Sequence, residues 1–443
     1  MRIRFWGTRG SLPIPSPSVM RYGGNTSCVE IRADDGTLVV LDCGTGIHGL
    51  GQELLATGKK SVDGHLLITH THWDHIQGFP FFAPLFVPGN TWKIYAPGGM
   101  GQDLERTLAG QMSYTYFPIT LDEMGATVHC NDLGEGSLDI GYIRVSTQYA
   151  NHPALTLGYR LEAGRKVVVY IPDHEPNSLH PIGAPPGTWP LHHEDRNHVA
   201  FLEGADLLIH DGQYTFEEYD KKVGWGHTPI EKAVDYAIAS QVKRLALFHH
   251  DPLRDDEAVD RLVEIANRRA GEGEHIPEVS AAAEGQIIEL PEEATGFPPV
   301  EPDSHAQISP ISQDRPKTVL IVDDDPHIIR LLSVTLAPEN LRVITTEDGE
   351  SAIQIAKEEQ PALILLDLVL PGIGGLEVCR ALRASAEHRI RNVPIIILTG
   401  KKLEEKDLLD CYGAGATDYM TKPITPTQLR SRIRGWLLRT ARL

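Results

Sequence analysis

The stretch His70-Thr71-His72-Trp73-Asp74-His75 decides the fold, because it places three imidazoles and a carboxylate within six residues. It follows the apolar run Leu66–Ile68, which predicts a β-strand. Alternate side chains of a strand share one face, so His70 and His72 should point together from its end. The following turn would bring Asp74 and His75 beside them. Ligands at this density suit zinc, manganese or iron, and one such cluster can feed two adjacent metals.

Composition limits the class of protein. The chain has 443 residues, which predicts two or three domains that each bury a core. Lysine and arginine number 41 against 60 aspartate and glutamate, a net charge of −19. A chain this acidic is a poor non-specific binder of nucleic acid or anionic membranes.

Cysteine usage and the N-terminus predict a cytoplasmic protein. No CxxC pair occurs, which indicates a reducing compartment without structural disulfides. The opening MRIRFWGTRGSLP lacks an apolar core of signal-peptide length, and no segment approaches a membrane span. The five cysteines are Cys28, Cys43, Cys130, Cys379 and Cys411.

Residues 291–316 have the composition of a linker, with six prolines, acidic residues and few apolar side chains. They divide the chain into domains at 1–290 and 317–443. Strand-like runs open the first domain, at Arg2–Trp6, Cys28–Arg32, Thr37–Leu41 and Leu66–Thr69. Helices follow later, one from a predicted capping box at Thr228–Glu231 and one from about Asp255. A layered α/β domain is expected.

A two-metal site needs ligands from more than one loop, and three candidates lie at the ends of apolar or strand-like runs. His152 precedes Leu155-Thr156-Leu157-Gly158-Tyr159-Arg160, Asp173 ends the run from Val167, and His249 follows Leu245–Phe248. His250 is the rival to His249, which is preferred because it directly follows the strand.

HTHWDH, HxxxxxGYR, YIPD and LFH, in this order, resemble the metallo-β-lactamase fold over residues 1–290. The resemblance implies an αββα sandwich with two metals at the strand ends. It assigns one metal to His70, His72 and His152, the second to Asp74, His75 and His249, and the bridging position to Asp173.

Two further segments resemble the phosphodiesterase branch of that superfamily, which includes tRNase Z-like enzymes and cyclic-nucleotide phosphodiesterases. They are Ala205–Asp211 and Gly226–Pro229, which is similar to a GHS/T motif. The resemblance implies that Asp211 orients His227 near the leaving group, with Asp74 as a further catalytic residue. Aspartate stands here where the tRNA-processing members usually carry glutamate.

Two divalent metals a few Å apart can activate water at neutral pH and neutralise phosphate charge. Arg9 and Asn25 lie in early Gly-rich loops that could approach this site and contact substrate. No long tRNA-clasping arm is evident, and the chain is acidic. The expected substrate is therefore a small phosphodiester or cyclic nucleotide rather than a folded RNA.

The second domain alternates continuous apolar strands with helical segments, which predicts a parallel sheet covered on both faces. Its strands deliver polar groups to the edge where open parallel sheets bind ligands. Carboxylates gathered there would repel one another without a cation, and oxygen ligands favour Mg²⁺. The polar groups are Asp323, Asp324, Asp325, Asp367, Thr399, Tyr419 and Lys422.

This pattern resembles the flavodoxin-like receiver domain of two-component response regulators over about 317–440. The resemblance implies phosphorylation of Asp367, Mg²⁺ held by Asp323 and Asp324 with Asp367, and phosphoryl contacts from Thr399 and Lys422. Tyr419 would be the switch aromatic, and Asp325 a flanking residue. The basic segment from Arg430 to Arg442 is expected to be the last helix of the domain.

Together these features predict a cytoplasmic signalling hydrolase, regulated when a sensor histidine kinase or phosphotransfer protein phosphorylates Asp367. The output would be altered contact between the domains or a change in homodimerisation. Two alternatives remain: a thioester or lactone hydrolase of the same fold, and a non-enzymatic di-iron gas or redox sensor. A scaffold with a vestigial metal site is disfavoured by the complete ligand set.

Overall fold

The computed structural model describes residues 1–98, 103–177, 185–187, 192–273, 275–291, 317–339, 341–400 and 405–439. The chain divides into two compact units, Met1–Pro310 and Ile311–Leu443. Apart from Pro291, the expected linker falls outside the described residues. None of the helices in the described parts has both the length and the apolar character that a bilayer crossing requires.

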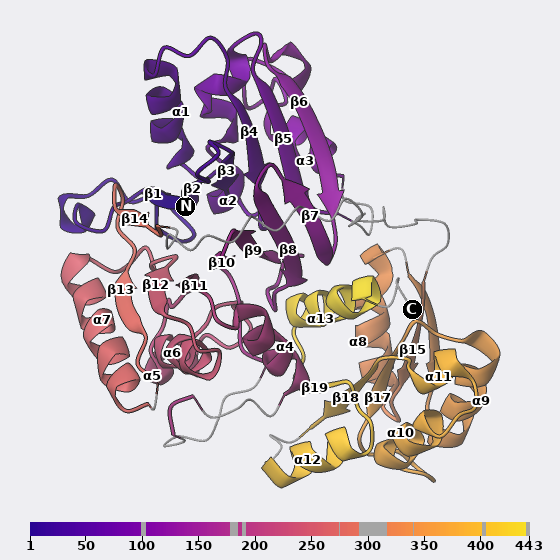
Figure 1. Ribbon diagram of the computed structural model, residues 1–443. Coiled ribbons are helices and arrows are strands. Elements are labelled where there is room, and N and C mark those ends of the chain that lie inside the picture. The colour runs from indigo at the N-terminus through magenta and orange to yellow at the C-terminus, as the bar shows by residue number, and fades with distance from the viewer. Residues whose placement is uncertain are drawn as a thin grey trace. The chain divides into compact units, whose positions relative to one another are not determined.

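The first unit contains two seven-stranded sheets (Figure 1). The first has the order β14-β1-β2-β3-β4-β5-β6, and the second β13-β12-β11-β10-β9-β8-β7. The strands of the first sheet are β1 (Arg2–Gly7), β2 (Cys28–Arg32), β3 (Leu38–Leu41), β4 (Asp63–Leu67), β5 (Thr91–Pro97), β6 (Thr127–Leu133) and β14 (Ile287–Glu289). Those of the second are β7 (Gly136–Ile140), β8 (Ile143–Tyr149), β9 (Leu157–Ala163), β10 (Lys166–Ile171), β11 (Leu207–Asp211), β12 (Arg244–Phe248) and β13 (Glu278–Ala281).

Helices pack on each sheet through separate buried apolar clusters. The α-helices of this unit are α1 (Ile47–Ala56), α2 (Trp73–Ile76), α3 (Leu104–Gln111), α4 (His193–Leu202), α5 (Phe216–Tyr219), α6 (Ile230–Ala239) and α7 (Asp256–Gly271). The 3₁₀ turns are η1 (Pro17–Val19), η2 (Phe79–Phe81), η3 (Ala83–Phe86) and η4 (Leu121–Glu123). One cluster joins α1 and α3 to the first sheet, and another joins α4, α6 and α7 to the second.

The two sheets contact each other directly through large buried side chains. The rings of Phe5 and Phe248 are 6.1 Å apart, and the Tyr159 hydroxyl donates to the carbonyl oxygen of Ile68 at 2.7 Å. Helix, sheet, sheet and helix therefore form successive layers, and the predicted αββα sandwich is confirmed.

Two local predictions were wrong. The strand expected at Leu66–Thr69 ends at Leu67, so His70 lies in an irregular segment and strand alternation does not aim it. The capping box expected at Thr228 is absent: Pro229 is the N-cap of α6, and the Thr228 hydroxyl donates to the carbonyl oxygen of His174. A tertiary hydrogen bond has taken the group that a local cap would use.

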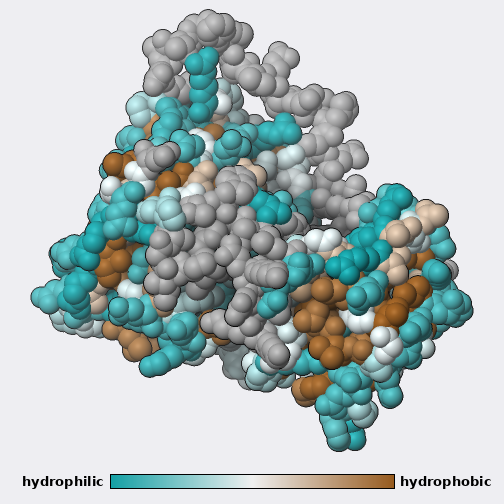
Figure 2. All heavy atoms as spheres, turned by 90° about the horizontal axis from the view of Figure 1, so that it is seen from below, coloured by the Kyte–Doolittle hydropathy of each residue, from teal (hydrophilic) through white to brown (hydrophobic). Residues whose placement is uncertain are grey.

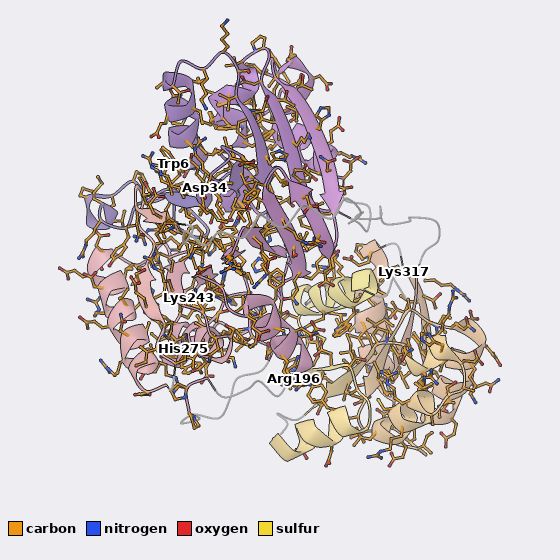
Figure 3. The ribbon with its side chains drawn as sticks, in the orientation of Figure 1. Trp6, Asp34, Arg196, Lys243, His275 and Lys317 are labelled. Atoms are coloured by element: carbon orange, nitrogen blue, oxygen red, sulfur yellow. The ribbon has the colours of Figure 1, made fainter. Side chains whose placement is uncertain are left out.

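A buried carboxylate links β10, β11 and β12 at their amino-terminal ends, opposite the ends that are followed by Asp173 and His249. Asp206 precedes β11 and is 5% exposed. Its Oδ1 accepts a hydrogen bond from Nζ of Lys243, which is labelled in Figure 3, at 2.8 Å. Its Oδ2 accepts one from the Val167 backbone N–H at 2.9 Å.

On the face drawn in Figure 2, hydrophilic side chains cover much of the coloured surface, with apolar patches between them.

The second unit is a five-stranded parallel sheet in the order β16-β15-β17-β18-β19. Its strands are β15 (Thr318–Val322), β16 (Arg342–Thr346), β17 (Leu363–Asp367), β18 (Ile395–Thr399) and β19 (Asp418–Thr421). Its helices are α8 (Pro326–Leu336), η5 (Ala337–Glu339), α9 (Gly349–Glu359), α10 (Gly375–Arg383), α11 (His388–Arg391), α12 (Glu405–Gly413) and α13 (Pro426–Arg439). This is the predicted flavodoxin-like fold, and α13 is the predicted last helix, with Leu429, Ile433 and Leu437 buried.

Candidate metal centre

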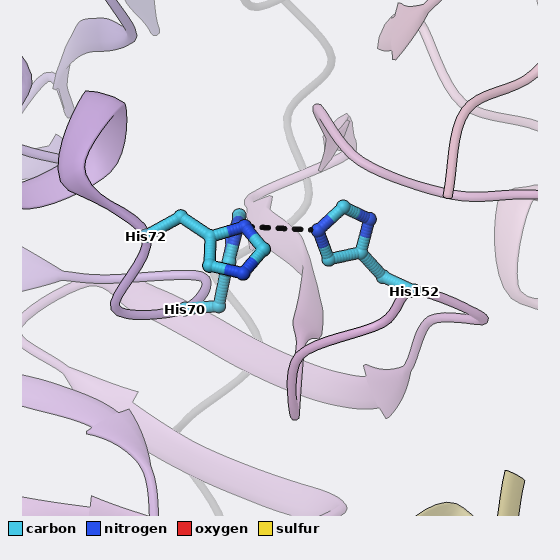
Figure 4. Close-up of side chains that lie close together, drawn as sticks. All are labelled: His70, His72 and His152. Carbon is cyan, nitrogen blue, oxygen red and sulfur yellow. Dashed lines mark hydrogen bonds between the residues drawn. The ribbon is translucent and has the colours of Figure 1, made fainter. Parts of the chain in front are cut away.

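Three imidazoles converge at one end of the sandwich, from two segments far apart in sequence (Figure 4). One ring nitrogen each of His70, His72 and His152 lies within 4.8 Å of the others. Nε2 of His152 is 3.2 Å from Nδ1 of His72. His152 donates its Nδ1 proton to the carbonyl oxygen of Gly226 at 2.9 Å, which leaves the Nε2 lone pair facing the other rings. Nε2 of His70 is buried and has no hydrogen-bond partner among the described residues, as expected of a ligand atom.

A second group adjoins the first and contains Asp74, His75 and His249. Nε2 of His249 is 2.9 Å from Oδ2 of Asp74 and 3.2 Å from Nε2 of His75. Asp173 belongs to groups with members of both sets, and its Oδ2 is 3.0 Å from Nε2 of His75. The same oxygen is buried, and apart from the ring nitrogens of His75 and His249 it has no polar partner among the described residues. The donor sets therefore fit two cations that share Asp173.

The backbone at the end of β12 directs the side chains of His249 and His250 to different places. His250 lies away from these groups, because its Nε2 donates to the carbonyl oxygen of Ala282 at 2.9 Å. His249 adopts a φ of 58°, a left-handed conformation that is costly for a residue with a side chain. This strained turn directs His249 to the centre, and the geometry favours it over His250 as the ligand.

Burial and charge set the protonation of the two groups differently. Burial lowers the pKa of His152 to about 3, and it also lowers the pKa values of His70 and His72, so these rings are neutral and able to bind a metal. Burial acts against the charged form of His75 too, but Asp74, Asp173 and Asp42 outweigh it and raise its pKa well above the ordinary value. In the second group the carboxylates thus stabilise the His75 ring as a cation. A bound metal would take the place of that ring proton and supply the positive charge instead.

Two residues that support the ligands were missed in the sequence. Asp42, buried and with a φ of 58°, accepts from Nδ1 of His75 at 2.8 Å and from the hydroxyl of Tyr170 at 2.8 Å. Gln213 places its amide nitrogen 2.6 Å from Nδ1 of His249. A metal-bound Nε2 leaves the proton on Nδ1, so in that state the amide oxygen would face it. Asp42 follows β3 as Asp173 follows β10, a pattern that could have identified it, whereas nothing in the sequence marks Gln213.

We expect Asp42→Asn to weaken zinc binding by roughly 10–100-fold, because His75 would lose the carboxylate that fixes its ring and tautomer. Competition with a chromophoric chelator measures the dissociation constants. Asp206→Asn is the matched control, since it alters a buried carboxylate away from the histidines. Equal zinc affinity in the Asp42 variant and wild type would contradict the role of Asp42.

Asp211 and His227 form the pair expected from the sequence. Oδ2 of Asp211 accepts from Nδ1 of His227 at 3.0 Å and from the backbone N–H of Thr228 at 3.0 Å. The side chain of Asp211 therefore reaches His227, although aspartate is shorter than glutamate. The His227 ring lies 5.1 Å from that of His249 and 5.5 Å from that of His152, beside both ligand groups. Burial opposes its charged form, but the hydrogen bond of Asp211 prevails and raises its pKa.

The two expected substrate-contacting residues are engaged by the protein itself. Arg9 is fully buried, and its guanidinium donates to three backbone carbonyls. The amide of Asn25 donates to Oε2 of Glu284 at 2.9 Å. Both side chains hold the early loops in place, and their contact with substrate stays a prediction. The carbonyls contacted by Arg9 belong to Gly23, Asp251 and Arg254.

In the second unit, the predicted polar groups meet at the carboxyl ends of the strands. Oxygen atoms of Asp323, Asp324 and Asp367 lie within 4.8 Å of one another. Nζ of Lys422 is 2.7 Å from Oδ2 of Asp323 and 2.8 Å from Oδ2 of Asp367, and these carboxylates raise its pKa against the effect of burial. This arrangement suits a hard cation and a phosphoryl group.

The remaining three predicted residues lie around this cluster. Thr399 ends β18 and is 2% exposed. Tyr419, on β19, is half-buried and packs against the apolar core. Asp325 is the N-cap of α8, where it accepts from the backbone N–H of His327 at 2.8 Å, in keeping with a flanking role.

Comparison with known proteins assigns both units. Residues 37–250 match the family model of the beta-lactamase superfamily domain, and residues 319–434 match that of the response regulator receiver domain. The chain is a beta-lactamase superfamily domain joined to a receiver domain. The first match spans every expected metal ligand from His70 to His249, and the second spans Asp323 to Lys422.

Curated relatives of this beta-lactamase–receiver protein include the DNA-binding response regulator MtrA of Mycolicibacterium smegmatis, 40% identical over 121 residues. The alkaline phosphatase synthesis transcriptional regulatory protein PhoP of Bacillus subtilis is 41% identical over 124 residues. These alignments cover 27% and 28% of this chain and 50% of each relative. The chain thus spans about half the length of the curated relatives it matches.

Solved structures similar to the beta-lactamase–receiver protein include two over most of the first unit. YhfI from Bacillus subtilis, a metallo-beta-lactamase fold protein, is 19% identical with a TM-score of 0.46, over 65% of this chain and 99% of that one. The short form of human tRNase Z is 21% identical with a TM-score of 0.44, over 66% of this chain and 100% of that one.

Proposed function

We propose that residues 1–290 form a dinuclear metal-dependent phosphodiesterase for a small phosphodiester or cyclic nucleotide, regulated by phosphorylation of the receiver domain at 317–443. The observation that carries this proposal is the position of Asp173, between two groups of ligand atoms and 3.5 Å from Nδ1 of His227. Two cations with an adjacent acid suit an ester whose phosphorus takes up a nucleophile while an alkoxide leaves.

Zinc fits the nitrogen-rich donor set best, and manganese and iron are the alternatives. Two bound cations would supply an activated water and neutralise the phosphate oxygens. His70, His72 and His152 would hold one cation. Asp74, His75 and His249 would hold the other, with Asp173 shared.

His227 is proposed to donate the proton that the leaving alkoxide needs. Asp211 binds Nδ1 of His227, so Nε2 is the nitrogen left for the leaving group. Asp211 also accepts from the Thr228 backbone, which fixes the carboxylate and hence the ring. Asp211 acts through His227 and is a positioning residue.

We expect His227→Ala to slow hydrolysis of 2′,3′-cyclic AMP by roughly 10²–10⁴-fold, because its alkoxide leaving group needs a proton. Bis(p-nitrophenyl) phosphate releases a stable phenolate, so its hydrolysis should slow far less. Steady-state kinetics of the zinc-loaded protein on both substrates measure the difference. His48→Ala, at an exposed position on α1, is the control. Equal slowing on both diesters would contradict the role of His227 as acid.

The receiver domain supports the regulatory part of the proposal. Asp323, Asp324 and Asp367 are proposed to hold Mg²⁺, and Asp367 to accept a phosphoryl group from a sensor histidine kinase or a phosphotransfer protein. Thr399 and Lys422 would contact that group, and Tyr419 would respond to it. The output is proposed to be altered contact between the domains or a change in homodimerisation.

A further inference from the structure

We propose that Trp73 and Trp225 form an aromatic subsite beside the metal centre, which stacks on the nucleobase of a nucleotide phosphodiester. Trp73 is 68% exposed and Trp225 is 55% exposed, although tryptophan is among the most apolar side chains. The inference rests on the proposed phosphodiesterase function and names its substrate class.

Each indole is attached to a segment that holds the candidate site. Trp73 is the first residue of α2 and lies between His72 and Asp74. Trp225 precedes Gly226, whose carbonyl oxygen accepts from Nδ1 of His152. A phosphate group held at the metal centre would therefore place its ester substituents within reach of these two segments.

The backbone that carries Trp225 is fixed by a buried glutamate. Oε1 of Glu175 accepts from the backbone N–H of Gly224 at 2.6 Å and from the hydroxyl of Tyr219 at 2.7 Å. Its Oε2 accepts from the backbone N–H of Gly226 at 2.8 Å. Because this backbone is already held in place, stacking on Trp225 would require little further ordering of the segment, and the exposed indole surface is available for binding.

Gly226 couples this segment to the metal centre through its backbone conformation. Its φ is 89°, and a Cβ added there would lie 2.3 Å from Nδ1 of His152. The close approach requires glycine, because any side chain would displace the ligand ring. The segment next to Trp225 and the orientation of His152 are therefore set together.

A lysine places positive charge beside the same ring. Nζ of Lys222 lies 3.9 Å from the ring centroid of Trp225 and 5.2 Å from that of Tyr214. The Tyr214 ring is in turn 6.0 Å from that of His227. In a chain with a net charge of −19, this cation favours an anionic substrate near the acid.

A nucleobase is the occupant that these features favour. It has two π faces on which an indole can stack, and one sugar separates it from the phosphate. An aliphatic ester group would gain only apolar burial from the indoles and would leave the cation beside Trp225 without a role.

The test is equilibrium binding of adenosine 5′-monophosphate and ribose 5-phosphate to the zinc-loaded full chain by isothermal titration calorimetry. Wild type should bind the nucleotide roughly tenfold to a hundredfold more tightly, the range expected for stacking of one base. Trp73→Leu with Trp225→Leu should remove that preference and leave ribose 5-phosphate binding unchanged. Tyr142→Leu, at the far end of β8 from His152, is the matched control.

Equal affinity for the two phosphates in wild type would overturn the inference, as would a preference that survives in the double variant. A change of oligomeric state in the double variant, measured by sedimentation, would also overturn it by showing that the indoles cover a second copy. Failure of the proposed function has a different result: wild type prefers the nucleotide but hydrolyses no phosphodiester.

Discussion

Asp74→Ala is expected to remove one of two bound metals and phosphodiester hydrolysis together. Oδ2 of Asp74 accepts from the backbone N–H of Ser11 at 2.7 Å and lies 2.9 Å from Nε2 of His249 and 3.3 Å from Nε2 of His75. Alanine leaves two imidazoles without the carboxylate between them. The loss of zinc affinity should exceed the roughly 10–100-fold effect of replacing a residue that only hydrogen-bonds to a ligand, because a proposed ligand itself is removed.

Two measurements on the same samples check this result. Elemental analysis should give two zinc equivalents in wild type and one in the variant, and bis(p-nitrophenyl) phosphate should be hydrolysed only by wild type. Asp139→Ala, an exposed carboxylate on β7, should match wild type in both. A variant with two metals and full turnover would contradict the assignment of Asp74. Wild type that binds two metals but hydrolyses no phosphodiester would argue against a phosphodiesterase. A high iron content would then favour the alternative of a non-enzymatic di-iron gas or redox sensor.

Much of the fold could be predicted from the sequence because the strands are marked by continuous or alternating apolar runs. β2 has the expected bounds, Cys28–Arg32, and β12 begins one residue before the expected Leu245, at Arg244. The errors arose where tertiary contacts override local preference. The Thr228 hydroxyl bonds to His174 rather than to its own helix, and no local pattern reports such a partner.

The candidate ligands were predictable because each lies just after a strand or in the HTHWDH segment, although His70 reaches the centre through an irregular segment. What the sequence did not show is where side chains point from loops. Arg9 lies in a Gly-rich loop like a substrate-binding arginine, yet it is directed inward to backbone carbonyls. Gln213 lies in a turn, and only the fold brings its amide to His249.

Asp367→Asn is expected to abolish phosphorylation of the chain by acetyl phosphate and Mg²⁺. In wild type, a carboxylate oxygen of Asp367 would attack phosphorus and acetate would leave. The amide of asparagine is too poor a nucleophile for this step. Asp367 ends β17, is 7% exposed, and has Oδ2 at 2.8 Å from Nζ of Lys422. The near-isosteric asparagine should preserve packing, so circular dichroism should match wild type while intact-mass spectrometry finds no added phosphoryl group.

The same variant separates regulation from catalysis. Acetyl phosphate should change the phosphodiesterase rate of wild type and leave that of Asp367→Asn unaltered, while the basal rates agree. Asp325→Asn is the matched control: Asp325 caps α8, and asparagine caps a helix equally well, so this variant should still be phosphorylated and respond. Wild type that gains the phosphoryl group but keeps its rate would contradict regulation. A response that persists in Asp367→Asn would place the phosphorylated residue elsewhere, because asparagine cannot form an acyl phosphate.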